Sequence, residues 1–417
     1  MKLLSASLVL AALASPLLAA ALPKEQLRDD QLQDGQSPII IIPGKGGSQL
    51  EVKVSHPDCA SDWSRVWINI YDFLPFTGHV ECWAQNMELQ YNTSSGESHT
   101  APGRQFRIPG WGTTESIEYI DPSWMAYLFG DVGSYAAYLV QELTNNWGYE
   151  RGVNLLGAPY DFRYSPVSHE EYFDDLKRLV EQTYLRNGRR RVLLVSHSMG
   201  GLMATFFLNH QTDDWKRSHI KGLVTLNTPW DGAMVVAQLH AAGDDWGIEI
   251  VDRNIIRDQQ RSYESAYFLL PHEPTWQSDD VIVRTPQRNF TVRDYEEMFD
   301  MLGHPEGKSV LRRARPAWSN IHHPGVDLYC WHGQGVDTVD AVHYSSDQWP
   351  NGIPDTHTGD GDGTVNLKSL NACSRFAEEP GSLTDVRGFD GVNHLDLLHD
   401  AGVMERLVAV ARGVDLP

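Results

Sequence analysis

Basic side chains are scarce in this sequence, in which 34 lysines and arginines stand against 55 aspartates and glutamates, giving a formal net charge of −21 at pH 7. A chain this acidic is repelled by phosphate backbones, which excludes nucleic acid as a partner and a polybasic membrane anchor at neutral pH. The 17 histidines make the charge strongly pH-dependent. In an acidic compartment they and some carboxylates gain protons, and repulsion from an anionic lipid surface decreases.

Long apolar runs are missing beyond the N-terminus. Residues 3–18 are apolar, a lysine precedes them and three alanines follow, which predicts a secretory signal peptide over residues 1–21 and a polar arm over 22–36. No later stretch has the length and hydrophobicity of a membrane-spanning helix. We expect a lumenal or extracellular protein. The sequons at Asn92 and Asn289 fit that compartment, because in a secreted chain they predict exposed glycosylation sites.

Cysteine is also scarce. The sequence has four, at Cys59, Cys82, Cys330 and Cys373. They allow three pairings, among which the sequence does not choose, although pairing neighbours is the simplest. The sequence has no His-Glu-x-x-His motif and no closely spaced cysteine pair, so we expect neither a metal nor a cofactor.

Residues 191–201 read Arg-Val-Leu-Leu-Val-Ser-His-Ser-Met-Gly-Gly. The short apolar run 192–195 predicts a buried parallel strand, and the small residues after it predict a sharp turn into a helix. A serine at the apex of such a turn has an exposed Oγ, and the helix amides behind it point toward an acyl oxygen. Ser198 is therefore the candidate nucleophile, although Ser196 stands where this pattern usually has glycine. The alternative is a glycine-rich turn with an incidental serine.

Strand and helix patterns alternate along most of the chain. Strands are predicted at 39–42, 153–156, 192–195, 221–226, 326–331 and 385–388, and amphipathic helices at 133–147 and 172–188. This alternation predicts an α/β fold with a doubly wound parallel sheet. The roughly hundred residues between 226 and 326 lack a sheet pattern and are too many for a connection, which predicts a cap domain.

The base and acid that such a serine needs follow it on this fold in the order Asp or Glu, then His. Asp362 lies in a glycine-rich loop and is the candidate acid; Asp360 is the alternative, or the two bind Ca²⁺, although the further ligands of an EF-hand are missing. His394 follows the last predicted strand and is the candidate base. His399 and His197 have structural roles by default.

An aromatic segment lies between the first two cysteines. Its large apolar side chains include Trp63, Trp67, Phe73, Leu74 and Phe76. It is either a satellite core or an apolar surface that inserts into lipid, and the sequence favours neither reading.

Several separate blocks resemble one family. They are residues 41–44 (Ile-Ile-Pro-Gly), 49–53 (Gln-Leu-Glu-Val-Lys), 108–112 (Ile-Pro-Gly-Trp-Gly), 121–122 (Asp-Pro), 147–152 (Trp-Gly-Tyr-Glu-Arg-Gly), 157–163, 197–200 (His-Ser-Met-Gly), 259–262 (Gln-Gln-Arg-Ser) and 359–369. In these blocks the chain resembles the family of lysosomal (group XV) phospholipase A2 and lecithin:cholesterol acyltransferase, with several blocks closest to the lysosomal branch.

The resemblance implies an α/β-hydrolase fold with a cap that contains a mobile lid, and a membrane-binding lobe that includes the aromatic segment. It implies the triad Ser198, Asp362 and His394, and oxyanion donors from the backbone amides of Lys45 and Met199. It also implies two disulfides, Cys59–Cys82 and Cys330–Cys373. Lys45 is a departure, because the lysosomal branch typically has aspartate there and the plasma branch cysteine; the backbone amide is unaffected.

The patterns and the resemblance together predict a division of the chain. It comprises the signal peptide (1–21), the arm (22–36), the start of the hydrolase core with the oxyanion loop (37–58), the aromatic lobe (59–105), core with the nucleophile (106–226), the cap (227–325) and core with the acid and the base (326–417).

The function implied is a serine phospholipase A and O-acyltransferase that acts at a phospholipid membrane surface and passes the acyl group to water or a lipid alcohol such as ceramide. The alternatives are a sterol O-acyltransferase, a catalytically weak lipid-binding protein, which should have a damaged triad, and a secreted peptidase, for which the aromatic segment has no purpose.

Overall fold

A computed structural model describes residues 35–74, 77–128, 133–244, 253–378 and 383–415, and its compact unit is Gln36–Pro417. The expected signal peptide, nearly all of the arm, and Phe76 lie outside the described residues. Within these residues, no helix combines the length and apolar character needed to cross a membrane.

A six-stranded, wholly parallel sheet forms the centre, in the order β15-β12-β9-β8-β1-β7. Its strands are β1 (Ile39–Ile42), β7 (Leu155–Gly157), β8 (Val192–His197), β9 (Ile220–Leu226), β12 (Leu328–Gln334) and β15 (Thr384–Asp390). All six predicted strands are present, with ends that differ by a few residues. The inner strands β1 and β8 are buried at every residue, as expected of parallel strands in a sheet that is covered on both faces.

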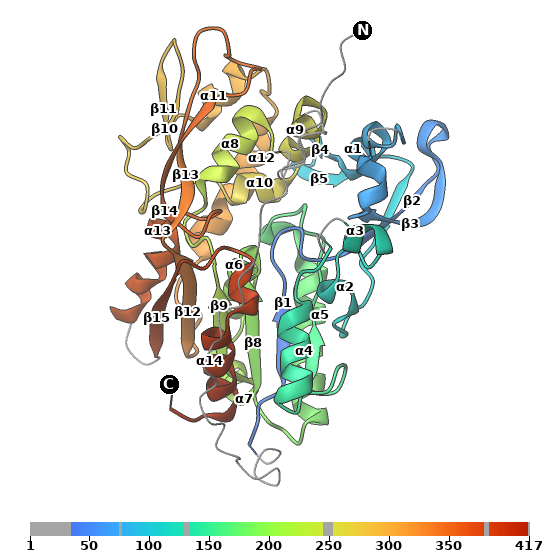
Figure 1. Ribbon diagram of the computed structural model, residues 1–417, viewed down its shortest axis with the longest axis vertical. Coiled ribbons are helices and arrows are strands. Elements are labelled where there is room, and N and C mark those ends of the chain that lie inside the picture. Colours follow the sequence, from blue (N-terminus) through green and yellow to red (C-terminus); the bar gives the residue numbers. More distant parts are fainter. Residues whose placement is uncertain (1–34, 75–76, 129–132, 245–252, 379–382, 416–417) are drawn as a thin grey trace, which may run out of the picture. The chain divides into compact units, whose positions relative to one another are not determined.

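Helices cover both faces (Figure 1). Side chains alternate along a strand, so Ile39 and Ile41 of β1 pack into one core cluster, with α4 (Ala137–Asn146) and α14 (Ala401–Arg412). Ile40 and Ile42 pack into the other cluster, with α5 (Glu170–Arg186) and α6 (Met199–Asn209). The arrangement is the α/β-hydrolase fold that the sequence predicts.

A lobe follows β1 in the chain. It consists of an antiparallel sheet of β2 (Leu50–Val54), β3 (Ser61–Trp67) and β6 (Arg104–Arg107), a hairpin of β4 (Leu89–Asn92) and β5 (Glu97–Thr100), helix α1 (Val80–Met87), and the short helices η2 (Pro57–Cys59) and η3 (Ile70–Phe73). The Cys59–Cys82 disulfide closes it, and Cys330–Cys373 ties β12 to η6 (Asn371–Glu378). Both pairings agree with those that the resemblance implies.

The predicted cap region contains strands, contrary to the expectation that it lacks a sheet pattern. β10 (Val281–Arg284) and β11 (Asn289–Thr291) join β13 (Val336–His343) and β14 (Asp355–Gly361) in a second sheet. The strands of residues 281–291 are too short to produce a clear period. The helices of this region are α8 (Met234–Ala242), α9 (Arg253–Arg261), α10 (Glu264–Phe268), α11 (Tyr295–Met301), α12 (Gly307–Ala314) and η5 (Arg315–Asn320).

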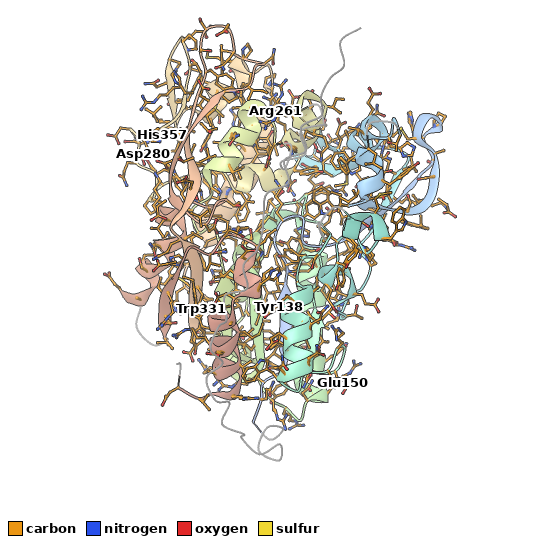
Figure 2. All side chains as sticks on the ribbon, in the orientation of Figure 1. Tyr138, Glu150, Arg261, Asp280, Trp331 and His357 are labelled. Carbon is orange, nitrogen blue, oxygen red and sulfur yellow. A yellow bond between two sulfur atoms is a disulfide. The ribbon has the colours of Figure 1, made fainter. Side chains whose placement is uncertain are left out.

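A buried arginine ties two of these helices together. Arg261 of α9 is 3% exposed, and its Nε donates to the carbonyl oxygen of His240 on α8 at 2.8 Å (Figure 2). The remaining short helices connect the larger elements. They are α2 (Glu115–Glu118), α3 (Trp124–Leu128), η4 (Pro166–Ser168), α7 (Asp213–His219), α13 (Leu367–Leu370) and η7 (Asp396–His399).

Candidate active site

Ser198 occupies a strained turn between β8 and α6. Its φ is 55° and its ψ −130°, a left-handed conformation that costs a non-glycine residue of order 1–3 kcal/mol. Its backbone N–H donates to the Leu226 carbonyl oxygen at 2.8 Å, which holds the turn against the neighbouring strand β9. The serine is partly exposed, whereas Met199 directly after it is buried. The turn therefore presents the hydroxyl rather than burying it.

The residues around Ser198 must be small because other backbone segments pass close by. A Cβ on Gly200 would lie 2.4 Å from the carbonyl oxygens of Ile42 and Pro43, and one on Gly201 would lie 1.9 Å from Thr228 Oγ1. At the position where glycine is usual, the hydroxyl of buried Ser196 donates to the carbonyl oxygen of Val224 at 3.1 Å. That hydrogen bond explains how serine is accommodated there.

His394 and Asp362 meet although they are 32 positions apart in the chain. His394 Nδ1 lies 2.7 Å from Asp362 Oδ2, and a carboxylate only accepts, so Nδ1 carries the proton. Asp362 Oδ1 accepts from the backbone N–H groups of Thr364 and Val365 at 2.9 and 2.7 Å. The Asp362 carboxylate is buried, and these donors hold it in one orientation. His394 Nε2 is left free to accept a proton.

The neighbouring Asp360 is placed differently. It is exposed on β14, and its Oδ1 accepts from the backbone N–H of Gly335 at 2.7 Å. Of the two acidic candidates, the structure brings Asp362 to His394. His399 is exposed and its ring lies 5.2 Å from that of Tyr138, outside the catalytic contacts described.

The glycine-rich loop after β1 lies directly against the candidate nucleophile. A Cβ on Gly44 would be 2.7 Å from the Ser198 Cβ, so only glycine fits there. The loop continues into Lys45, and Met199 occupies the first turn of α6, where backbone N–H groups have no partner within the helix. The backbone amides of Lys45 and Met199 thus belong to the two segments that flank Ser198. This is the arrangement that an oxyanion hole requires.

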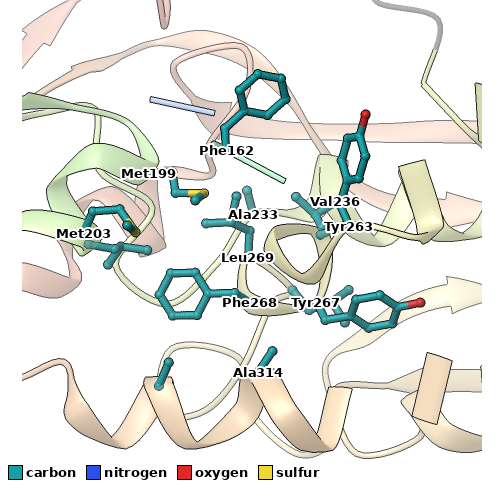
Figure 3. Packing of buried hydrophobic residues seen from close by; sticks show 14 of the residues in the cluster. Phe162, Met199, Met203, Ala233, Val236, Tyr263, Tyr267, Phe268, Leu269 and Ala314 are labelled. Atoms are coloured by element: carbon teal, nitrogen blue, oxygen red, sulfur yellow. The ribbon is translucent and has the colours of Figure 1, made fainter. Parts of the chain in front are cut away.

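A cavity of about 550 Å³ contains Ser198 and His394. Its other walls are mainly apolar, with Trp67, Phe162, Pro229, Ala233, Val235, Val236, Leu239, Tyr263, Leu269, Val365 and Leu395. Phe162, Ala233, Val236, Tyr263 and Leu269 belong with Met199 to one core cluster, part of which Figure 3 shows. A cavity of this size and character fits a hydrocarbon chain whose ester reaches the serine.

Two charged residues, Lys45 and Asp244, also line this cavity. Burial lowers the pKa of Lys45 from 10.5 to about 8, and the nearby Asp244 opposes that shift. The Lys45 Nζ lies 5.8 Å from the centre of the Tyr263 ring, within reach of a cation–π interaction. With a pKa of about 8, the ammonium group is charged at neutral pH in a mainly apolar cavity that Asp244 also lines.

Trp67 and Phe73 correct the expectation that they contact a membrane. They are 8% and 3% exposed and belong to the main core cluster. The Trp67 ring lies 5.1 Å from that of Phe162, and its Nε1 donates to the Gly46 carbonyl oxygen at 2.7 Å. Trp67 thus supports the oxyanion loop and lines the cavity, because aromatic side chains next to a sheet edge are buried by the neighbouring core. Phe73 packs against Trp83.

Exposed aromatic side chains occur instead on α3. Trp124 is 69% and Tyr127 75% exposed, and their i, i+3 spacing places them on one face of this helix. Helix α3 contacts η3, where Tyr71 is also exposed. Trp63 and Leu74, which the sequence also singles out, are partly exposed. The sequence signal for α3 is weak, because two aromatic residues in a short helix do not stand out.

Asn227, which sequence reasoning missed, holds the backbone of the candidate base. Its Nδ2 donates to the His394 carbonyl oxygen at 2.9 Å, and its Oδ1 accepts from the backbone N–H of Gly333 at 2.7 Å. It has a positive φ of 52° directly after β9. Asparagine after a predicted strand is a signal for a functional loop, but the contact with His394 spans 167 positions.

The predicted glycosylation sites are both exposed, Asn92 at the end of β4 and Asn289 at the start of β11. Of the described histidines, cysteines, aspartates and glutamates, no three are grouped so that they could hold a metal ion. A larger cleft of about 960 Å³ lies elsewhere, and charged residues such as Arg293, Arg315 and Arg375 line it. It lacks both Ser198 and His394, so we assign the chemistry to the smaller cavity.

Comparisons with known proteins match most of the chain. A family model described as lecithin:cholesterol acyltransferase matches residues 63–318. The lysosomal phospholipase A and acyltransferase of Homo sapiens is 35% identical over 396 residues, covering 93% of this chain and 93% of that protein. The phosphatidylcholine-sterol acyltransferase of Gallus gallus is 34% identical over 370 residues, covering 87% of each. A chain in the crystal structure of the Tle4-Tli4 complex is similar in fold, with a TM-score of 0.55 and 14% identity, covering 90% of this chain and 98% of that chain.

Proposed function

Since the chain belongs to the lecithin:cholesterol acyltransferase family, we propose that it is a serine-dependent phospholipase A and O-acyltransferase. It cleaves fatty acyl esters of glycerophospholipids and passes the acyl group to water or to a lipid alcohol such as ceramide. The observation that carries this proposal is the His394–Asp362 pair sharing an apolar cavity with Ser198. The relatives named lysosomal phospholipase A and acyltransferase support the same activity.

In the first step, the Ser198 Oγ attacks the ester carbonyl carbon while His394 Nε2 takes its proton. The backbone N–H groups of Lys45 and Met199 receive the negative charge on the carbonyl oxygen, and Asp362 stabilises the imidazolium. When the tetrahedral intermediate collapses, the ester C–O bond breaks. The proton passes from His394 to the departing lysophospholipid oxygen, leaving the acyl group on Ser198.

In the second step, water or a lipid alcohol attacks the acyl-serine. His394 takes the proton of the acceptor and returns it to the Ser198 Oγ as the acyl–oxygen bond to serine breaks. The apolar walls that α8 contributes to the cavity lower the access of bulk water, which lets a lipid alcohol compete with it. We assign helices α8 to α12 to a cap, and by resemblance part of it acts as a lid.

A sterol O-acyltransferase is the second candidate, because the Gallus gallus phosphatidylcholine-sterol acyltransferase is nearly as similar as the lysosomal relatives. Both activities use the same serine chemistry and oxyanion donors. Selection between ceramide and sterol must therefore come from the walls of the cavity rather than from Ser198, Asp362 and His394.

We also propose that the protein enters the secretory pathway, acts in the lysosome or outside the cell, and binds phospholipid membranes peripherally. The apolar N-terminal run and the two exposed sequons support the first part. The exposed Trp124 and Tyr127 on α3 support the second, because aromatic side chains partition into membrane interfaces.

One assay tests the activity and the choice of acceptor. Purified protein is incubated from acid to neutral pH with phosphatidylcholine liposomes that contain equal amounts of ceramide and cholesterol, and the lipid products are separated. We expect lysophospholipid, free fatty acid and acylated ceramide. Predominant cholesteryl ester would favour the sterol acyltransferase, and free fatty acid without either ester would leave a phospholipase.

The Ser198→Ala variant is the control, because it keeps the fold and removes the nucleophile. Product formation that persists in this variant would contradict the proposal. Intact liposome binding without any product from the wild-type protein would indicate the lipid-binding alternative.

A further inference from the structure

Two buried side chains outside the proposed triad, Tyr135 and His197, form a chain of hydrogen bonds between the oxyanion loop and the loop of His394. The Gly44 N–H donates to Tyr135 Oη at 2.8 Å. Tyr135 Oη lies 2.7 Å from His197 Nδ1, and His197 Nε2 lies 2.9 Å from the His394 carbonyl oxygen. Tyr135 is 7% and His197 3% exposed, so water does not replace these bonds easily.

Every proton in this chain is assigned by the groups at its two ends. The His394 carbonyl only accepts, so His197 Nε2 carries a hydrogen. Burial and the nearby His394 lower the pKa of His197 to about 3, which leaves the imidazole neutral and Nδ1 an acceptor. The Tyr135 hydroxyl therefore donates to Nδ1 and receives the Gly44 N–H. All donors in this series therefore point the same way, from the Gly44 N–H through Tyr135 and His197 to the His394 carbonyl oxygen.

Steric contacts reinforce the bond from Tyr135 to the loop. A Cβ on Gly47 would lie 2.6 Å from Tyr135 Cζ, so the tyrosine ring packs directly against this loop residue. The loop in turn lies against Ser198, because a Cβ on Gly44 would lie 2.7 Å from the Ser198 Cβ. A shift of Tyr135 therefore displaces the loop that carries the Lys45 amide.

At the other end, the bond from His197 holds the backbone of His394. The His394 carbonyl oxygen accepts from His197 and from Asn227 Nδ2, both at 2.9 Å. The rings of His197 and His394 lie 4.8 Å apart. Asp362 holds the His394 ring through Nδ1. Both the backbone and the side chain of His394 are therefore fixed by hydrogen bonds.

We infer that Tyr135 and His197 are positioning residues that couple the placement of the oxyanion loop to that of His394. The inference rests on the proposed function, in which these two parts act on the same ester. Neither side chain touches the substrate in this role. Their effect is to keep the oxyanion donors and the base in register with Ser198, a requirement that is sensitive to shifts of less than 1 Å.

The test uses Tyr135→Phe, His197→Phe and the double variant, with a short soluble ester such as p-nitrophenyl butyrate as substrate. Active serines are counted by titration with a fluorophosphonate, so that kcat refers to folded sites only. We expect kcat to fall about tenfold to a hundredfold in each single variant, because a misplacement of about 1 Å at the reacting groups can cost up to about a hundredfold, with KM within about twofold. Because either substitution interrupts the same series of hydrogen bonds, kcat of the double variant should be little lower than that of the single variants.

Matched controls separate positioning from packing. Tyr149 is a buried tyrosine whose hydroxyl donates to the Ser37 carbonyl oxygen at 3.0 Å, and His169 is a buried histidine whose Nε2 lies 3.0 Å from the Asp161 carbonyl oxygen. Tyr149→Phe and His169→Phe should lower the melting temperature while kcat per titrated site stays at the wild-type value. In His197→Gln the amide N–H stands in for Nε2–H, so kcat should recover part of the loss.

Wild-type kcat per titrated site in both single variants would overturn the inference. So would a glutamine variant no better than the phenylalanine variant, or fully multiplicative losses in the double variant. If the wild-type protein neither hydrolyses the ester nor reacts with the fluorophosphonate, the proposed function fails instead. An active wild-type enzyme whose variants are unchanged leaves that function intact and removes only the roles of Tyr135 and His197.

Discussion

At the scale of single residues, the placement of Asp362 decides between two aspartates that the sequence presents as near equals. Asp362 lies in the loop after β14, where it is buried and contacts His394, whereas Asp360 lies on β14 and is exposed. The local sequence Gly-Asp-Gly-Asp-Gly is symmetric around the two carboxylates. The position of the His394 loop, which follows the C-terminal end of β15, distinguishes them.

We therefore expect Asp362→Asn to lower kcat by about 10³ to 10⁴ on both phospholipid and soluble ester, because the amide does not stabilise the imidazolium and disfavours the required tautomer. Asp360→Asn should retain near wild-type kcat. Steady-state kinetics of the two isosteric variants, with circular dichroism to verify folding, make the comparison. Loss of activity in Asp360→Asn alone would reverse the assignment.

Lys45 is the residue at which this chain departs from the pattern that it resembles, and its charge has two opposite consequences. Lys45 lines the same cavity as Ser198, and we expect its ammonium group to favour the negative charge that develops in the transition state. In the folded state its burial is unfavourable, because the pKa of about 8 lies below that of the unfolded chain. The cost is fully present at neutral pH, where Lys45 is protonated in both states. Between about pH 8 and 10.5 the unfolded state binds more protons, so the cost disappears as pH rises through this range.

Lys45→Met should consequently raise the free energy of unfolding at pH 7 by roughly 1 to 3 kcal/mol and lower kcat. Urea unfolding at pH 7 and at pH 10 measures the first effect, and the gain should shrink at the higher pH. In the wild-type enzyme kcat should fall above about pH 8 as Lys45 loses its proton, and the variant should lack this decline. A variant that is less stable at pH 7 than the wild type would contradict this account.

At the scale of elements, the lobe and the helix α3 that contacts it divide the two alternatives that the aromatic segment left open. Trp67 at the end of β3 and Phe73 in η3 are core residues, as the satellite-core reading expected. Trp124 and Tyr127 on α3 supply the exposed apolar surface that the membrane reading expected. Density of aromatic residues along the chain does not separate the two roles, because burial depends on what packs against each element.

Replacing Trp124 and Tyr127 together with serine should weaken binding to phosphatidylcholine liposomes by about tenfold or more, and lower lipid turnover in parallel. Hydrolysis of a soluble ester should stay unchanged, since the substituted side chains are at the surface. Liposome sedimentation and the two assays measure these effects.

Trp67→Ser is the contrasting variant, because it removes a buried ring and the bond to the oxyanion loop. It should cost about 3 to 5 kcal/mol of stability and reduce turnover of both substrates. Normal liposome binding by the α3 double variant would exclude α3 as the membrane contact.

The start of α4 illustrates how tertiary contacts set the ends of elements. The sequence pattern predicts a helix from residue 133, but the helix begins at Ala137. Backbone N–H groups of Tyr135 and Ala136 donate instead to the carbonyl oxygens of Glu118 and Ile117, and Ser134 forms a bridge with Tyr119. This extended segment is what places Tyr135 beside the oxyanion loop.

At the scale of the whole molecule, the buried histidines determine how stability depends on pH. Burial lowers the pKa of six of them, His169, His197, His240, His272, His304 and His332. The unfolded chain then binds more protons than the folded one below about pH 6.5, so stability falls as pH falls. Glu88, whose pKa burial raises, has the opposite effect, but it is one group against six.

The melting temperature should therefore be several degrees lower at pH 5 than at pH 7. Differential scanning calorimetry in buffers of equal ionic strength measures it. His197→Gln should reduce the difference between the two pH values, because it removes the group whose pKa is lowered to about 3. A higher melting temperature at pH 5 would contradict the prediction.

The sequence by itself determined the parallel sheet, the nucleophile turn and the order of acid and base. These features have local causes. A run of four apolar residues, such as 39–42, forms a strand that is buried on both faces. Gly200 and Gly201 follow Ser198 because other segments pass too close there for a side chain. The family resemblance added the disulfide pairs. For Ser198, Asp362 and His394, the structure supplies the positions, and their roles await the substitutions described above.

Tertiary structure alone decided the contacts that join distant segments. The sequence contains no signal that Tyr135, His197 and Asn227 meet around His394, or that Trp67 supports the loop at Gly46. These hydrogen bonds join residues that are 21 to 197 positions apart, so each depends on how the intervening elements pack. Periodicity and motif spacing report only what a residue's neighbours in the chain require, so partners supplied by another strand or loop become visible only in the fold.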